Sequence, residues 1–86
     1  MTPQERFAQN LRRRRLAVGI SQEELGERTD LHRTEISLLE RAGREPRFAT
    51  LLKLCGALST TPNELCAGTG WDHVKRVFTV EPLPAD

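Results

Sequence analysis

The chain has 86 residues, a formal net charge of +1 and an apolar content of 37%, which is ordinary for one small globular domain. This length is near the lower limit for a single hydrophobic core, so it excludes a second catalytic domain or a large ligand pocket. No apolar stretch approaches the roughly 20 residues of a membrane span, and the N-terminus lacks the apolar core of a signal peptide. We therefore expect a cytoplasmic protein with no membrane partner.

Charge is distributed unevenly along the chain. Residues 1–53 contain 11 of the 13 Lys and Arg but 8 of the 12 Asp and Glu, so this part is +3 and the remainder −2. Four consecutive arginines, Arg12 to Arg15, lie in the basic part, although such a run is usually a solvated helix face. Non-specific DNA packaging is disfavoured, because it depends on phosphate neutralisation and the net charge is nearly zero.

Capping signals and helical spacing divide the first 68 residues into five expected helices. A Ser or Thr followed three positions later by Glu forms a capping box, and this pattern marks helix starts at Thr2, Ser21 and Thr61. Gly19 ends the first helix, and Asp30, which tolerates positive φ, makes the turn after the second. The expected helices cover about 3–18, 22–29, 33–41, 47–58 and a short segment that begins at 62.

Residues 21–40 are the part around which the chain is organised. Four apolar residues are spaced so that two short amphipathic helices can pack at an angle, namely Leu25, Leu31, Ile36 and Leu39. The second of these helices then presents a mixed face outward, which is the candidate reading surface. The outward residues are Arg33, Thr34, Ser37 and Leu38.

Two charged residues are expected inside the bundle. Arg15 lies four positions after Leu11 on the inner stripe of the first helix, and Glu40 lies four after Ile36 on the buried side of the third. An unpaired buried charge is very costly. We therefore predict an ion pair between Arg15 and Glu40.

The fourth expected helix has the apolar pattern of a core helix. Its side chains recur at helical spacing at Phe48, Leu51, Leu54, Cys55 and Leu58, and all five are expected in the core.

The last part of the chain has a different pattern. Residues 74–81 alternate with period two and are followed by prolines, which predicts one strand with no sister strand in the chain. A lone strand leaves its backbone groups unpaired, so it pairs with another copy, pairs with a different protein, or packs as a frayed tail. We favour a two-fold dimer with antiparallel strands. Its expected interface residues are Trp71, Val74, Val77, Phe78 and Val80.

No arrangement of side chains in the sequence indicates catalysis or a bound metal. His32 and His73 lack metal-ligand spacing with the two cysteines, so no metal and no cofactor are expected. The serines have no paired base with a third orienting group. Cys55 and Cys66 are interpreted as small apolar fillers, with a redox switch as the less favoured alternative.

These motifs together resemble the phage repressor and Cro type of helix-turn-helix DNA-binding domain, the XRE-like family. The resemblance covers about Phe7 to Leu65 and depends on the segments SQEEL at 21–25 and ISLLE at 36–40, on Pro46, and on the helix at 51–58. It implies an all-α fold, a five-helix repressor-like bundle. We expect residues 1–68 to form the DNA-binding domain and 69–86 a C-terminal β-strand extension used for dimerisation.

The resemblance also implies roles for individual residues. Three positions on the family's third helix read bases and match Arg33, Thr34 and Leu38, and Ser37 lies one turn from Arg33. The glutamine that opens the second helix contacts phosphate and matches Gln22. The family's inward arginine and glutamate match Arg15 and Glu40, in agreement with their spacing. The expected phosphate contacts are Ser21, Gln22, His32, Arg41 and Arg44.

Three positions depart from the family pattern. Gly26 replaces the usual alanine of the second helix, at a propensity cost of about 1 kcal/mol. His32 stands where Ser or Thr usually opens the third helix. The glycine that usually follows Glu40 by two positions is displaced to Gly43, which predicts a different path for the loop to the fourth helix.

The leading hypothesis is a sequence-specific transcriptional regulator, a repressor that binds double-stranded DNA at a palindromic operator as a homodimer. Arg33 is the best candidate for a bidentate contact to guanine. The alternative is an antitoxin-like or anti-activator module that binds a different protein through its C-terminal strand.

Overall fold

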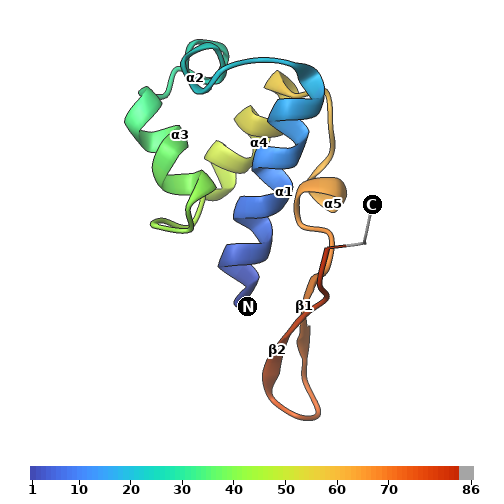
Figure 1. The fold of residues 1–86 in the computed structure, drawn as a ribbon. Coiled ribbons are helices and arrows are strands. Elements are labelled where there is room, and N and C mark those ends of the chain that lie inside the picture. Colours follow the sequence, from blue (N-terminus) through green and yellow to red (C-terminus); the bar gives the residue numbers. More distant parts are fainter. Residues whose placement is uncertain (84–86) are drawn as a thin grey trace.

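The computed structural model describes residues 1–83, which form five α-helices and a C-terminal hairpin (Figure 1). All five expected helices are present, with bounds that differ from the expected ones by about one residue, so the repressor-like bundle is confirmed. Residues 84–86, the end of the expected tail, lie outside the described part. The elements are α1 Pro3–Val18, α2 Gln22–Thr29, α3 Arg33–Glu40, α4 Phe48–Ala57, α5 Pro62–Leu65, β1 Thr69–Asp72 and β2 Val77–Val80.

Capping explains where the first two helices begin. Thr2 and Glu5 form a complete capping box, in which each side chain accepts a hydrogen bond from the other's backbone N–H. At α2 the Ser21 hydroxyl accepts from the Glu24 N–H at 3.1 Å, while the Glu24 carboxylate accepts from Arg28. The capping signals therefore place these helix starts, although only the first is a reciprocal box.

Helices α1 to α5 all contribute to one core. The fully buried side chains are Leu11, Leu25, Ile36, Leu39, Leu54, Leu58 and Leu65. One expectation about α4 is wrong, because Phe48 is 73% exposed. It occupies the first position of α4, one turn ahead of the side chains of this helix that reach the core. Helical spacing predicted the correct face of α4 but not the point at which the bundle ends.

The turn between α2 and α3 is tight. Asp30 is left-handed, with φ of 59°, and the Leu31 N–H donates to the Gly26 carbonyl at 3.0 Å. A Cβ atom on Gly26 would lie 2.5 Å from the Leu31 oxygen, a backbone atom that cannot move without the turn. The alanine that is usual at this position in the family that the motifs resemble therefore does not fit here, and glycine allows the close approach.

The C-terminal segment is a hairpin rather than a lone strand. β1 pairs antiparallel with β2, with Trp71 opposite Phe78, so the expectation of no sister strand is wrong. The Asp72 carboxylate accepts from two backbone N–H groups in the turn, and Arg76 is left-handed with φ of 60°. β1 is four residues long and contains Gly70, which conceals the period-two pattern on which strand prediction depends.

The hairpin begins against an arginine on α1. Arg6 is only 5% exposed, and its Nε and Nη1 atoms have no hydrogen-bond partner within residues 1–83. Gly68, with φ of 81°, lies so close that a Cβ atom there would be 2.5–2.8 Å from the guanidinium. The burial of Arg6 was not expected from the sequence.

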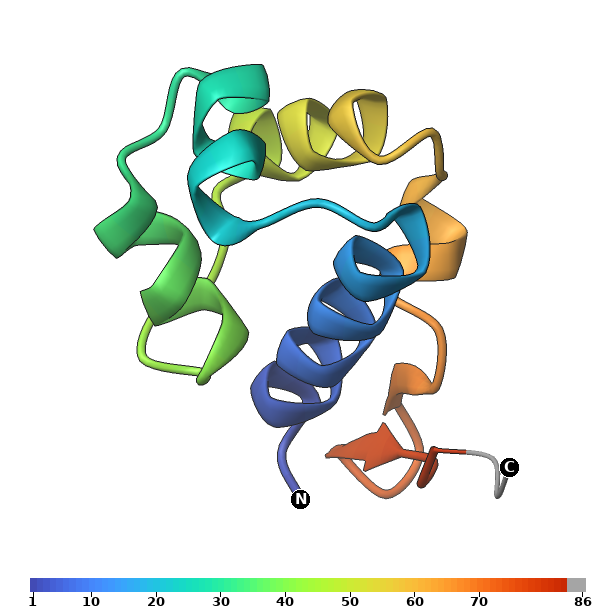
Figure 2. The same ribbon diagram turned by 45° about the horizontal axis from the view of Figure 1, so that its top comes forward.

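The hairpin and α3 lie on opposite sides of α1 (Figure 1), and Figure 2 shows the same separation after rotation. Within residues 1–83 there is no helix of the length and apolar character that crossing a bilayer requires.

Gly26 and Gly56 provide a matched test of the tight turn. Replacing Gly26 with Ala is expected to lower the free energy of unfolding by about 1–3 kcal/mol, because the methyl group meets the Leu31 carbonyl. Gly56 lies in α4, where an added Cβ atom would find open space within 4 Å, so Gly56→Ala is expected to raise it by about 0.5–1 kcal/mol. Urea unfolding measures both; equal stabilisation by the two substitutions would contradict the close approach.

Candidate nucleic-acid interface

The outer face of α3 is open to solvent. Arg33 and Thr34 are exposed at the start of the helix, and Ser37 and Leu38 are half-buried one turn later. On the opposite side of α3, Ile36 and Leu39 are almost fully buried. The helix is therefore amphipathic in the expected sense, and its four candidate reading residues share the side that the core does not use.

His32 caps α3. Its Nδ1 atom accepts from the Thr34 N–H at 3.0 Å and lies 2.8 Å from the Thr34 hydroxyl. Since Nδ1 is an acceptor toward the backbone, the hydroxyl is the donor in the second contact. Thr34 therefore directs its hydroxyl hydrogen toward His32 and leaves its methyl group and oxygen lone pairs for a base edge.

The beginning of α2 lies next to the end of α3. The Ser21 hydroxyl is occupied as the cap of α2, and Gln22 Nε2 donates to Glu40 Oε1 at 3.3 Å. Gln22, an expected phosphate contact, is thus hydrogen-bonded to the carboxylate of the last residue of α3.

Arg15 and Glu40 form the expected ion pair. Arg15 Nε and Nη2 donate to the two Glu40 oxygens at 2.6 and 2.9 Å, and Nη1 donates to the Ile20 carbonyl at 2.9 Å. The two side chains are only 10% and 4% exposed. The hydrogen bond with Glu40 raises the pKa of Arg15, against the opposing effect of burial. The pair joins α1 to α3 and reaches the segment before α2.

Three arginines lie at or after the end of α3. Arg41 is the C-cap of α3 and Arg47 the N-cap of α4, and both are exposed. Arg44 pairs with Glu35, a residue of the first turn of α3 that was not among the expected site residues. Arg47 was not among them either, although its position three residues after Arg44 is visible in the sequence.

The loop retains a left-handed residue at the position where the family usually has glycine. Ala42 has a φ of 59°, while Gly43 does not have positive φ. The Gly43 N–H donates to the Leu38 carbonyl at 2.8 Å, which is the hydrogen bond expected where a left-handed residue ends a helix. The displaced glycine therefore does not mark the left-handed turn, which an alanine makes here at some conformational cost.

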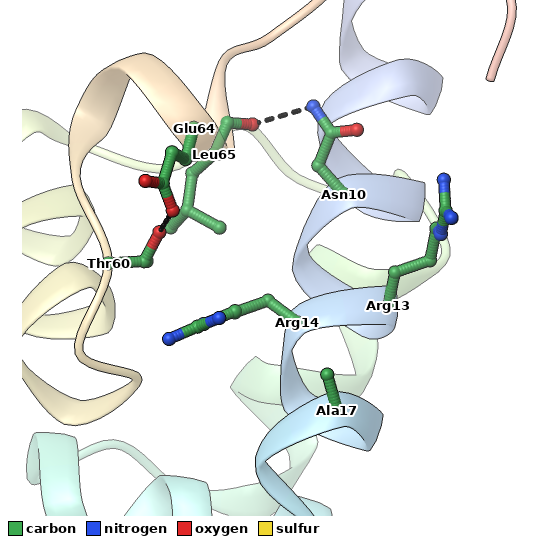
Figure 3. Close-up of a pocket in the computed structure, with 7 residues that line it drawn as sticks. All are labelled: Asn10, Arg13, Arg14, Ala17, Thr60, Glu64 and Leu65. Atoms are coloured by element: carbon green, nitrogen blue, oxygen red, sulfur yellow. Dashed lines mark hydrogen bonds between the residues drawn. The ribbon is translucent and has the colours of Figure 1, made fainter. Parts of the chain in front are cut away.

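A hollow of about 280 Å³ lies between α1 and α5 (Figure 3). Arg14 extends across it and donates to the Leu58 and Ser59 carbonyls, so it satisfies backbone groups after α4. Asn10 donates to the Leu65 and Ala67 carbonyls in the same way. These side chains connect the elements and do not present a vacant set of donors to a ligand.

The surroundings of the two cysteines disfavour the thiolate form. Cys55 is 5% exposed and Cys66 is half-buried, and both are free thiols. Burial raises the pKa of both, so the reactive thiolate is less populated at neutral pH than in an ordinary cysteine.

Comparison with known proteins gives the class of the molecule. The family model described as helix-turn-helix, HTH_3, matches residues 11–65, and the chain belongs to this family of Cro and C1 repressor type. The resemblance inferred from the motifs is thereby confirmed. The protein is a helix-turn-helix DNA-binding transcriptional regulator, and its family is not one of enzymes.

The relatives of this chain include control proteins and a phage repressor. The control protein C.SmaI of Serratia marcescens is 39% identical over 70 residues, which are 81% of this chain and 83% of that protein. The restriction-modification controller C.AhdI of Aeromonas hydrophila is 39% identical, with a TM-score of 0.69, over 71% of this chain and 92% of its own. The P22 c2 repressor, solved in complex with a synthetic operator, is 34% identical, with a TM-score of 0.68, over 72% and 94%.

The buried pair gives a prediction about stability. Glu40→Ala leaves the Arg15 guanidinium buried without its carboxylate, so we expect the free energy of unfolding to fall by about 3–5 kcal/mol. Glu24→Ala is the control, because it removes the same group from an exposed pair with Arg28 and is expected to cost less than about 1 kcal/mol. Urea unfolding of the two variants tests this, and similar losses would contradict a special role for the buried pair.

Proposed function

We propose that the protein is a sequence-specific repressor that binds a palindromic operator as a homodimer, with α3 in the major groove. The observation that carries the proposal is the open outer face of α3, on which Arg33 and Thr34 are exposed while the opposite face is buried. A helix of this shape fits the major groove, where each base pair presents a distinct pattern of donors and acceptors. The relation to the P22 c2 repressor, a protein solved with an operator, supports the same mode.

Base reading is assigned to four residues of α3. Arg33 can donate two hydrogen bonds to guanine O6 and N7, which is the commonest specific contact. Thr34 and Ser37 offer a hydroxyl oxygen or a methyl group, and Leu38 can contact a thymine methyl. One arginine among short neighbours implies one dominant G·C position in each half-site.

Phosphate contacts are assigned to the residues around the reading helix. Those at the start of α2 and α3 approach the backbone from one side, and the basic loop after α3 does so from the other. The assigned residues are Ser21, Gln22, His32, Arg41 and Arg44, and we add Arg47 because it is exposed in the same loop.

The hairpin is assigned to the homodimer. Trp71 and Phe78 form an edge-to-face pair with ring centroids 4.9 Å apart, yet they are 54% and 67% exposed. Val80 lies on the same face of β2 as Phe78 and is half-buried, while Val74 in the turn and Val77 on the opposite face of β2 are also exposed. Each strand of a two-stranded sheet also has one free edge, so two hairpins can join about a two-fold axis. A second copy is the occupant that a palindromic site requires.

The exposed hairpin also favours a second candidate function, in which it binds a different protein. An antitoxin-like or anti-activator module would use the same apolar face for that protein. The internal pairing of β1 and β2 removes one reason for this candidate, since neither strand needs a foreign strand to form.

The role of Arg33 is testable by selecting bound duplexes from a random DNA pool at near-physiological salt. The wild type is expected to select a palindrome with a guanine in each half-site. Arg33→Ala is expected to lose that guanine and about 1–3 kcal/mol of affinity, because the bidentate contact is gone. Arg12→Ala, which removes an exposed arginine of α1, serves as the control and should keep the consensus. Equal weakening on every sequence by Arg33→Ala would identify a phosphate contact instead.

The dimer is tested by sedimentation of hairpin variants. We expect the wild type to sediment as a dimer and Trp71→Thr/Phe78→Thr as a monomer with unchanged helix content, since both side chains are largely exposed in one chain. Leu16→Thr removes an exposed apolar side chain from α1 and should remain dimeric. A monomeric wild type at about 100 µM, a concentration at which micromolar affinity would populate the dimer, would favour the second candidate.

A further inference from the structure

Glu35 and Arg44 form an ion pair at the edge of the reading helix. Arg44 Nη1 lies 2.7 and 2.5 Å from the two carboxylate oxygens of Glu35. The Arg44 side chain is 55% exposed and that of Glu35 27%. Both line a hollow between α3 and the loop that follows it. The Arg44 side chain is therefore largely solvated, whereas Glu35 is held in position because it belongs to α3.

Arg44 differs from the other arginines of the loop in having an acidic partner. The side chains of Arg41 and Arg47 form no ion pair or hydrogen bond within the described residues, and both are exposed. A guanidinium neutralised by a carboxylate on the same surface adds little net attraction for DNA. Each phosphate contact contributes about 0.9 to the magnitude of the slope of log K against log salt concentration. While Arg44 is paired with Glu35, we therefore expect this slope to be shallower by about 0.9.

The exposed ion pair is also weak enough to open. Pairs of this exposure contribute at most about 1 kcal/mol to stability. In the operator complex proposed above, base contacts fix one register, and a fixed register keeps one phosphate beside the loop. On other sequences no single register is held, and Glu35, which is part of α3, remains the nearest anion to Arg44.

We propose that Glu35 is a specificity-determining residue that holds Arg44 away from phosphate on non-operator DNA and releases it on the operator. Glu35 thereby lowers sequence-independent affinity and increases the ratio of specific to non-specific binding. This ratio, and not the affinity alone, decides occupancy of one site among many competing ones. The inference rests on the proposed DNA-binding function and assigns a regulating contact to the same site.

The test is a double-mutant cycle on a 24-base-pair non-palindromic duplex, with binding measured between about 50 and 200 mM salt. Glu35→Gln is expected to tighten binding roughly fivefold to tenfold near 0.1 M and to steepen the salt slope by about 0.9, because Arg44 becomes available. Arg44→Gln alone is expected to change affinity less than about twofold. When Arg44→Gln is added to Glu35→Gln, it should abolish both the gain in affinity and the increase in salt slope that Glu35→Gln causes.

Glu45→Gln is the matched control. Glu45 is exposed in the same loop, and its side chain pairs with no described residue. Glu45→Gln removes one negative charge, as Glu35→Gln does, but frees no arginine. It is expected to leave the slope unchanged. On the consensus duplex from the selection experiment, Arg44→Gln should weaken the wild type, and Glu35→Gln should reduce the ratio of consensus to non-palindromic affinity.

The outcomes separate this inference from the proposed function. Additive effects of Glu35→Gln and Arg44→Gln, or a Glu45→Gln effect equal to that of Glu35→Gln, would overturn the inference while DNA binding stands. Failure of the wild type to bind any duplex would overturn the proposed function and this inference together. Circular dichroism of each variant verifies that the helices remain folded.

Discussion

The orientation of α3, the helix to which base reading is assigned in our proposal, depends on the buried ion pair between Arg15 and Glu40. The arginine belongs to α1 and the glutamate is the last residue of α3, so their two hydrogen bonds fix one helix against the other. Ile20 and Gln22 join the same network through a carbonyl and a side-chain amide. A buried polar network stabilises one arrangement only when its groups are satisfied. The burial of Ile36 and Leu39 therefore decides which face of α3 is turned inward, and the polar contacts of Glu40 fix the end of the helix against α1.

The molecule separates its two exposed surfaces. The outer face of α3 is polar and carries Arg33, whereas the hairpin presents the aromatic pair of Trp71 and Phe78. These surfaces lie on opposite sides of α1 (Figure 1). Because a polar face suits the grooves of DNA and an apolar one suits protein, the two do not compete for one partner.

Predictions from sequence succeeded where the cause was local. The cap at Thr2 and the left-handed Asp30 depend on neighbours in the chain, and they were predicted correctly. The outward face of α3 followed from spacing, and an inward charge required a partner. Failures came from contacts that spacing does not record. Helical period does not reveal that Phe48 lies beyond the core, and nothing local to Glu35 shows that a later loop brings Arg44 to it.

Arg6, whose Nε and Nη1 atoms have no hydrogen-bond partner among residues 1–83, gives the molecule two levels of local stability. When the hairpin is in place, the cation loses most of its hydration, and no group in the described part of the chain accepts a hydrogen bond from Nε or Nη1. Lifting the hairpin returns water to Arg6, and this hydration offsets part of the packing energy that the hairpin gives up when it leaves α1. Opening of the hairpin is therefore less costly than opening of the bundle, whose charge at Arg15 is fully paired. In hydrogen-exchange terms, the amides of β1 and β2 report a local equilibrium, and those of α1 report the unfolding of the whole domain.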